Sequence, residues 1–137
     1  MKSSAQIRSM YVRDAVASAS PVGVLVMLYD RLLLDLHWAV EAQLESDWHR
    51  ASGRLIHAQD IVAELSSTLK PELWDGGDAL MALYVYVAQL MRTGNVSHDV
   101  ARIQECIELL EPLRLAWHAA ADGTEAADAQ IRISAVG

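Results

Sequence analysis

The segment that decides the fold is residues 21–44, which read PVGVLVMLYDRLLLDLHWAVEAQL. Ser20 is a favourable helix N-cap, and Pro21 suits the first helical position, where its missing N–H costs nothing. Apolar side chains would cover well over half of the circumference of this helix. A helix of a four-helix bundle buries only about a third to a half of its circumference, so some of these side chains need a further cover.

The next segment, residues 47–69, is bounded by helix signals at both ends. Ser46 or Asp47 can cap its start, and Pro71 stops it just beyond its end. Its apolar residues step by three or four positions, and polar residues occupy most of the positions between them. This pattern predicts an amphipathic helix.

Two further helices are expected at residues 75–93 and 98–121. The first ends at Gly94, which we interpret as the glycine that commonly follows a helix C-terminus. The second begins near Ser97 and contains Pro112, which removes one backbone hydrogen bond and therefore predicts a kink.

Short connections between these four helices predict that neighbours pack antiparallel. The sequence therefore predicts an all-α fold, an antiparallel up-down four-helix bundle, in one domain of residues 1–121. Residues 5–17 carry a weaker pattern and are expected to form a short N-terminal accessory helix. Residues 122–137 lack sustained periodicity and are expected to form a mobile tail.

The charge and the uncharged stretches exclude several kinds of partner. Eleven Lys and Arg stand against 18 Asp and Glu, and the net charge of −7 disfavours nucleic acid and anionic lipid. The longest uncharged stretch, residues 15–29, is too short to span a membrane. No apolar core follows the basic N-terminus, so a cleaved signal is not expected and the protein is predicted to be cytoplasmic.

No catalytic or metal-binding constellation is apparent. The Glu-x-x-His signature of di-iron bundles is missing, and the five histidines lie beside polar residues, which indicates surface positions. The sequence has neither a nucleophile elbow nor a phosphate loop, and the lone Cys106 is expected to be a small buried apolar residue. We therefore predict a protein that is not an enzyme and needs no cofactor or metal.

Residues 75–93 repeat the apolar excess of residues 21–44. A homodimer interface or a fifth helix of the same chain would cover the spare faces, and so would a partner helix docked in a hydrophobic groove. Tyr84 and Tyr86 favour a binding surface, because tyrosine combines apolar area with a polar tip. We place Leu33 on the same spare surface, and Leu28 and Leu110 in the core.

A series of short motifs resembles the flagellar export chaperone family FliS. The first is Tyr11 followed by the run Val16-Ala17-Ser18-Ala19-Ser20-Pro21, and then by Leu25 and Met27-Leu28-Tyr29-Asp30. Later matches keep the family's order and lie at Ala58-Gln59-Asp60-Ile61, Glu64-Leu65, Leu69, Leu83-Tyr84, Tyr86, Leu90, Asn95, Leu110, Leu113-Arg114 and Ala116-Trp117. The resemblance spans roughly residues 7–120. The sequence departs from the family at Ser18, at Arg31 and at the pair Val22-Gly23, where the family usually has Thr, Gly and an acidic pair.

The resemblance implies a small cytoplasmic chaperone for flagellin. Such a protein binds the otherwise disordered C-terminal region of flagellin, prevents premature polymerisation and delivers the subunit to the flagellar type III export gate. The alternative is a non-catalytic, homo-oligomeric helical bundle, and a homodimer of the free protein fits either function. From the spare faces and the family motifs together, the expected partner-binding residues are Ile7, Tyr11, Val16, Tyr29, Leu33, Leu83, Tyr84, Tyr86 and Leu90.

The N-terminal segment is expected to act as a lid. Ile7 and Tyr11 are too apolar to remain in water, yet the segment is too short to be a stable free helix. Docking on the bundle would cover part of the spare surface. The competing interpretation is that Tyr11 contacts the partner directly.

Overall fold

The computed structural model describes Ser4, residues 21–73 and residues 75–136. The described chain forms four α-helices and one short 3-10 helix, with no strand among these residues. In chain order they are α2 (Pro21–Leu44), α3 (Trp48–Thr68), η1 (Pro71–Leu73), α4 (Gly77–Val96) and α5 (Val100–Val136). The expected accessory helix at residues 5–17 lies outside the described residues.

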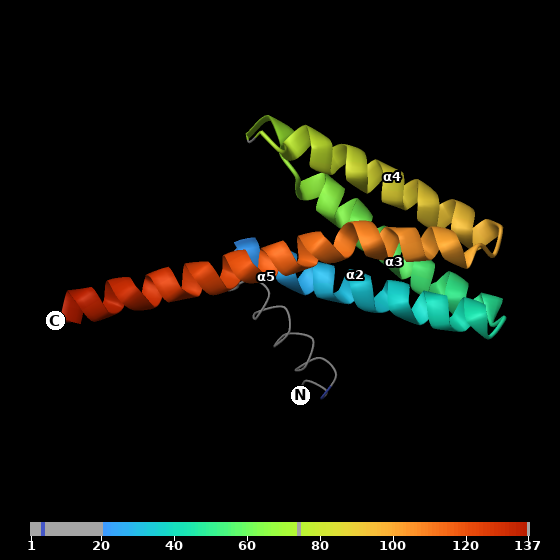
Figure 1. The fold of residues 1–137 in the computed structure, drawn as a ribbon, viewed down its shortest axis with the longest axis horizontal. Coiled ribbons are helices and arrows are strands. Elements are labelled where there is room, and N and C mark those ends of the chain that lie inside the picture. The colour runs from blue at the N-terminus through green and yellow to red at the C-terminus, as the bar shows by residue number, and fades with distance from the viewer. Residues whose placement is uncertain (1–3, 5–20, 74, 137) are drawn as a thin grey trace.

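The four helices form an antiparallel bundle, and the predicted fold is confirmed. α2 packs against α3 and α5, and α4 packs against the same two helices, so the chain runs around the bundle in sequence order. Each helix runs opposite to the one before it, and the C-terminal part of α5 projects beyond the others (Figure 1). The ring centroids of Trp48, the first residue of α3, and His98, in the connection between α4 and α5, lie 3.9 Å apart with the rings stacked, which joins these two parts of the chain.

Side-chain caps fix two of the helix starts. Asp47 caps α3 by accepting a hydrogen bond from the backbone N–H of Arg50 at 3.2 Å. Asp99 caps the start of α5 by accepting a hydrogen bond from the backbone N–H of Ala101 at 3.2 Å. The expected start near Ser97 is therefore two residues too early.

Gly94 does not end a helix, and our interpretation of it is wrong. α4 continues to Val96, and no described glycine has a positive φ. The reason for glycine here is close packing, because a Cβ atom would lie 2.6 Å from Cδ1 of Ile103. The side chain of Gln43 also donates to the Gly94 carbonyl at 3.1 Å, which joins α2 to α4.

The expected helix end near residue 121 is also wrong, because α5 continues to Val136. The extension is rich in alanine, the strongest helix former, and helix propensity does not require an amphipathic pattern. The search for periodicity therefore missed it. The predicted mobility of residues 122–137 stays a prediction.

The core is centred on two tyrosines and the aliphatic side chains around them. Tyr29 of α2 and Tyr84 of α4 are buried, and their hydroxyl oxygens lie 2.6 Å apart in a hydrogen bond. Cys106 is buried as expected, and burial raises the pKa of its thiol to about 12. The other fully covered side chains include Leu32, Leu36, Leu55, Val87, Met91, Ile103 and Leu110.

A close backbone approach at the start of α4 gives a first prediction. A Cβ atom on Gly77 would lie 2.4 Å from Cα of Pro71, so Gly77→Ala must push η1 away from α4. We expect the free energy of unfolding in urea to fall by about 1–3 kcal/mol. The matched control is Gly53→Ala in α3, where nothing lies within 4 Å and alanine should stabilise the helix by about 0.5–1 kcal/mol. Equal effects of the two substitutions would contradict the packing argument.

Candidate functional site

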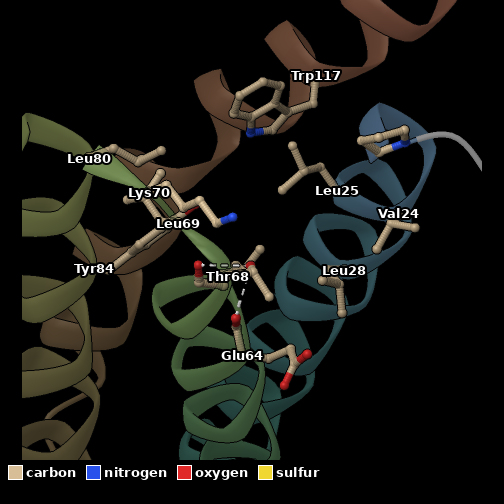
Figure 2. A pocket seen from close by; sticks show the side chains of 12 residues that line it. Val24, Leu25, Leu28, Glu64, Thr68, Leu69, Lys70, Leu80, Tyr84 and Trp117 are labelled. Atoms are coloured by element: carbon tan, nitrogen blue, oxygen red, sulfur yellow. Dashed lines mark hydrogen bonds between the residues drawn. The ribbon is translucent and has the colours of Figure 1, made fainter. Parts of the chain in front are cut away.

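An apolar hollow of about 500 Å³ lies at the end of the bundle where α2 begins and α3 ends. Side chains from all four helices line it, and Figure 2 shows Trp117 and Leu25 across the hollow from Leu80 and Tyr84. Polar groups are few and include Glu64, Thr68 and Lys70. We call this hollow the end groove, and its lining is Pro21, Val24, Leu25, Leu28, Glu64, Leu65, Thr68, Leu69, Lys70, Leu80, Tyr84 and Trp117.

A second apolar hollow of about 400 Å³ adjoins the end groove between α4 and α5. The two hollows share Leu80 and Trp117, which form the ridge between them. Several of its lining residues are small, which lets another backbone approach closely. We call it the side groove, and its lining is Gly76, Ala79, Leu80, Leu83, Leu113, Ala116, Trp117 and Ala120.

Local sequence signals explain why this end of the bundle is hollow. The chain leaves α3 at Leu69 in an extended conformation, and Pro71 prevents the helix from continuing. Leu25 and Leu28 lie about one helical turn apart on α2 and are only partly buried, because no further described helix covers them. The apolar side chains of three helix ends therefore face a shared hollow.

A polar network fixes Trp117 over the hollow. Arg114 donates to Oδ1 of Asp30 at 3.1 Å, and Nε2 of His118 lies 2.7 Å from the same oxygen. Arg114 also donates to Glu111 at 2.8 Å. These contacts join α5 to α2 on both sides of Trp117 in the sequence, and its ring lies 6.3 Å from that of Tyr29 between ring centroids.

The network predicts a pH dependence of stability. Burial raises the pKa of the Asp30 carboxyl, but hydrogen bonds from His118 and Arg114 outweigh burial and hold its pKa below the ordinary 3.8. A lowered pKa in the folded state contributes stability above the ordinary pKa, and this contribution is lost as pH falls through the lowered value. Asp30→Asn should therefore lower the free energy of unfolding by no more than about 1 kcal/mol at pH 7, since the Asp30 side chain is 44% exposed.

The cost of Asp30→Asn, measured by urea unfolding of wild type and variant at pH 7 and in acid, should shrink towards zero as the pH falls through the lowered pKa of Asp30, because the carboxylate is then protonated. Glu108→Gln, an exposed substitution on the same α5, is the matched control and should show no such difference. A cost that is the same at both pH values would show that the charge of Asp30 does not stabilise the bundle.

Other kinds of site are not found among the described residues. In that part of the chain, no group of three or more His, Cys, Asp or Glu side chains is placed to hold a metal ion. None of the described helices has the length and hydropathy of a membrane span. In the end groove, the Thr68 hydroxyl donates to the backbone carbonyl of Glu64 at 3.1 Å.

Comparison with known proteins identifies the family of the chain. The sequence model of the family described as flagellar protein FliS matches residues 3–124. The chain belongs to the FliS family. A curated relative, the flagellar secretion chaperone FliS of Bacillus subtilis (strain 168), is 28% identical over 107 residues, which cover 78% of this chain and 80% of the relative.

A solved structure supports the same fold. A crystal structure of a flagellar chaperone from bacteria superimposes with a TM-score of 0.69 at 19% sequence identity. The match covers 88% of this chain and 99% of that chain. The resemblance to the FliS family seen in the sequence is confirmed.

Four residues expected to bind the partner are buried in this member of the FliS family. Tyr29, Leu33, Tyr84 and Leu90 are at most 4% exposed, so the assignment of Leu33 and Tyr84 to a spare surface is wrong, while a role of these four residues in partner binding stays a prediction. Neighbouring helices cover these residues, and a count of apolar residues on one helix does not reveal which side its neighbours occupy. Tyr84 nevertheless reaches the lining of the end groove.

The remaining expected residues are divided between three locations. Leu83 lines the side groove, whereas the exposed Tyr86 donates its hydroxyl to the Glu105 carboxylate on α5 and lines neither groove. Leu28, expected in the core, is a partly buried wall of the end groove. The predicted Ile7, Tyr11 and Val16 lie outside the described residues.

Sequence reasoning missed most of the groove lining. The omitted apolar residues are Val24, Leu25, Leu65, Leu69, Leu80 and Trp117. For the first five the available signal was their position near the ends of α2, α3 or α4, where a bundle loses its neighbours, whereas Trp117 lies in the middle of α5. Residues at such ends can be apolar and still only partly covered.

Proposed function

We propose that this protein is a cytoplasmic flagellar export chaperone whose grooves bind the C-terminal region of flagellin. In this function it prevents premature polymerisation and delivers the subunit to the flagellar type III export apparatus. The observation that carries the proposal is the pair of adjoining apolar hollows, about 500 and 400 Å³, in a member of the FliS family.

The shape and chemistry of the grooves suit a helical segment of a partner. Amphipathic helices bind hydrophobic grooves through apolar anchors at i, i+3, i+4 and i+7, and a disordered segment can fold as it docks. The side groove runs between α4 and α5 and has a floor of small residues, while the end groove has room for larger side chains. A partner segment that covers both would hide its own apolar face from other flagellin subunits.

The function needs no reaction. The polar groups that line the end groove are Glu64, Thr68, Lys70 and the buried Tyr84, and the hydroxyls of Thr68 and Tyr84 are already hydrogen bonded within the bundle. These groups form no nucleophile with an adjacent base. Binding and release alone are sufficient for a chaperone.

Binding to flagellin with and without its C-terminal segment tests the proposal. We expect the purified protein to bind intact flagellin and not the truncated form, as measured by isothermal titration calorimetry. Equal binding to both, or binding to neither, would contradict the proposed function. Sedimentation velocity of the free protein tests the alternative function, since a homo-oligomeric bundle would self-associate without flagellin.

Deleting residues 1–17 tests the proposed lid. We expect the deletion to tighten binding of the flagellin C-terminal segment, by about a hundredfold if the lid covers the site 99% of the time. The dissociation constants of the two chain lengths decide the matter. Weaker binding by the shortened chain would show instead that Ile7, Tyr11 or Val16 contacts the partner directly.

A further inference from the structure

The outer side of α2 carries an apolar stripe that neither groove uses. Met27, Leu34 and Trp38 form this stripe and Arg31 lies along its edge; the four positions follow one another at intervals of four, three and four residues, so they share one side of the helix. This side points away from the buried Leu36, and Met27 and Leu34 remain 46% and 41% exposed. We call these four residues the α2 outer face.

Two arginines border this face where it meets α3. The guanidinium carbon of Arg31 lies 5.2 Å from the centre of the Trp38 ring, and that of Arg54 on α3 lies 4.2 Å from it. Guanidinium groups at these distances are attracted to the face of an indole ring. Trp38 therefore holds both cationic groups beside the apolar stripe.

A buried carboxylate forms ion pairs with the same two arginines. Asp35 is fully buried, and its Oδ1 lies 3.4 Å from Nε of Arg31 and 3.9 Å from Nη1 of Arg54. Its other oxygen pairs with Nδ1 of His57. Neither arginine donates a hydrogen bond to Oδ1, so the two ion pairs favour positions beside Trp38 without locking the side chains.

The edge of the α2 outer face that meets α3 is positively charged, although the net charge of the chain is negative. Two guanidinium groups share one carboxylate, so the cluster of Arg31, Arg54 and Asp35 has an excess of positive charge in a protein of net charge −7. The two arginine side chains are 44% and 38% exposed, so they are accessible to a partner. The planar guanidinium fork fits a carboxylate with two parallel hydrogen bonds.

We infer that the α2 outer face is a second docking surface, whose occupant is an amphipathic helix of another protein with carboxylates along the edge that meets α3. Met27, Leu34 and Trp38 receive its apolar side chains, and Arg31 and Arg54 receive its carboxylates. A second copy packed antiparallel through this face would bring the two arginine borders together, which like charge disfavours. The surface goes beyond the proposed function, because it leaves both grooves open.

A designed pair of peptides tests the inference without flagellin. The first is a synthetic helical peptide of 18 residues with leucines at i, i+4, i+7 and i+11 and glutamates along one edge, and the second has glutamine in place of each glutamate. We expect the full chain to bind the glutamate peptide at least about tenfold more tightly in fluorescence anisotropy, with the preference reduced by salt.

Variants of exposed residues locate the binding. Leu34→Asp should raise the dissociation constant of the glutamate peptide by at least about 25-fold. Val85→Asp, which changes a 61% exposed residue on α4, should leave that constant unchanged. Arg54→Lys keeps the charge but loses the planar fork, and should reduce the preference for glutamate over glutamine. Circular dichroism of each variant checks that the fold is retained.

Several results would overturn the inference. Equal affinity for the two peptides would remove the role of the arginine border, and tight binding by Leu34→Asp would place the peptide elsewhere. Self-association of the wild-type chain that Leu34→Asp abolishes would make the face a contact between copies. Loss of flagellin binding in Leu34→Asp would assign the face to the flagellin site. Failure of flagellin to bind the wild type would contradict only the proposed function.

Discussion

Leu25→Asp is expected to weaken binding of the flagellin C-terminal segment by at least about 25-fold while the bundle stays folded. Leu25 is a partly buried wall of the end groove, so a charge there would face the apolar side chains of a bound segment (Figure 2). An anchor of this kind contributes about 2 kcal/mol or more to binding. Calorimetry with the flagellin segment measures the loss, and circular dichroism measures the fold.

Leu44→Asp is the matched control for the groove. Leu44 is 68% exposed and is the last residue of α2, whereas the end groove lies where α2 begins. The same substitution there should leave the dissociation constant unchanged. An equal loss in both variants, or no loss at Leu25, would show that the end groove is not the flagellin site.

Tyr84→Asp, in contrast to Leu25→Asp, should unfold the protein. Tyr84 is 1% exposed, and its hydroxyl is hydrogen bonded to that of Tyr29. An aspartate would bury an unpaired charge and leave a cavity, which together cost more than about 4 kcal/mol. Urea unfolding should therefore show a loss at least as large as that of Leu110→Ala, about 2–5 kcal/mol.

A milder variant separates the hydroxyl of Tyr84 from its ring. Burial raises the pKa of both tyrosines, so the pair keeps its protons and its hydrogen bond in the physiological range. Tyr84→Phe should lower the free energy of unfolding by about 1–3 kcal/mol, because it removes the hydrogen-bond partner of the Tyr29 hydroxyl. A folded Tyr84→Asp variant that had lost only flagellin binding would show that Tyr84 belongs to the binding surface after all.

The fold was predictable because its signals are local. Pro21, Asp47 and Pro71 each act on the few residues beside them, and the structure starts or ends a helix close to each one. Gly94 shows the limit of this reasoning. Its role depends on Ile103 in the next helix, and nothing in the surrounding sequence distinguishes a packing glycine from a terminal one.

The site was less predictable because it depends on how each helix is rotated. Tyr84 and Leu28 are both apolar residues of very apolar helices, and we assigned them the wrong way round. Their environment is set by contacts distant in sequence, such as that between Tyr84 and Tyr29, which are 55 positions apart. Trp117 reaches the groove through contacts of its neighbours with Asp30 on α2, which no periodicity encodes.

The burial of Asp35 was not predicted. Asp35 lies between the core positions Leu32 and Ala39, and a carboxylate in such an apolar stretch signals a buried ion pair. Its partners Arg54 and His57 come from α3, so the pairing itself required the structure.

Site-specific crosslinking tests the central claim, that the end groove holds the flagellin C-terminal segment, most directly. A photoreactive phenylalanine analogue replaces Leu69 in the groove lining, or Ile56 on the exposed side of α3 as the control. After irradiation with the flagellin segment, mass spectrometry should find a crosslinked product at residue 69 and none at residue 56. Crosslinking at residue 56 alone, or at neither position while the segment binds, would contradict the account.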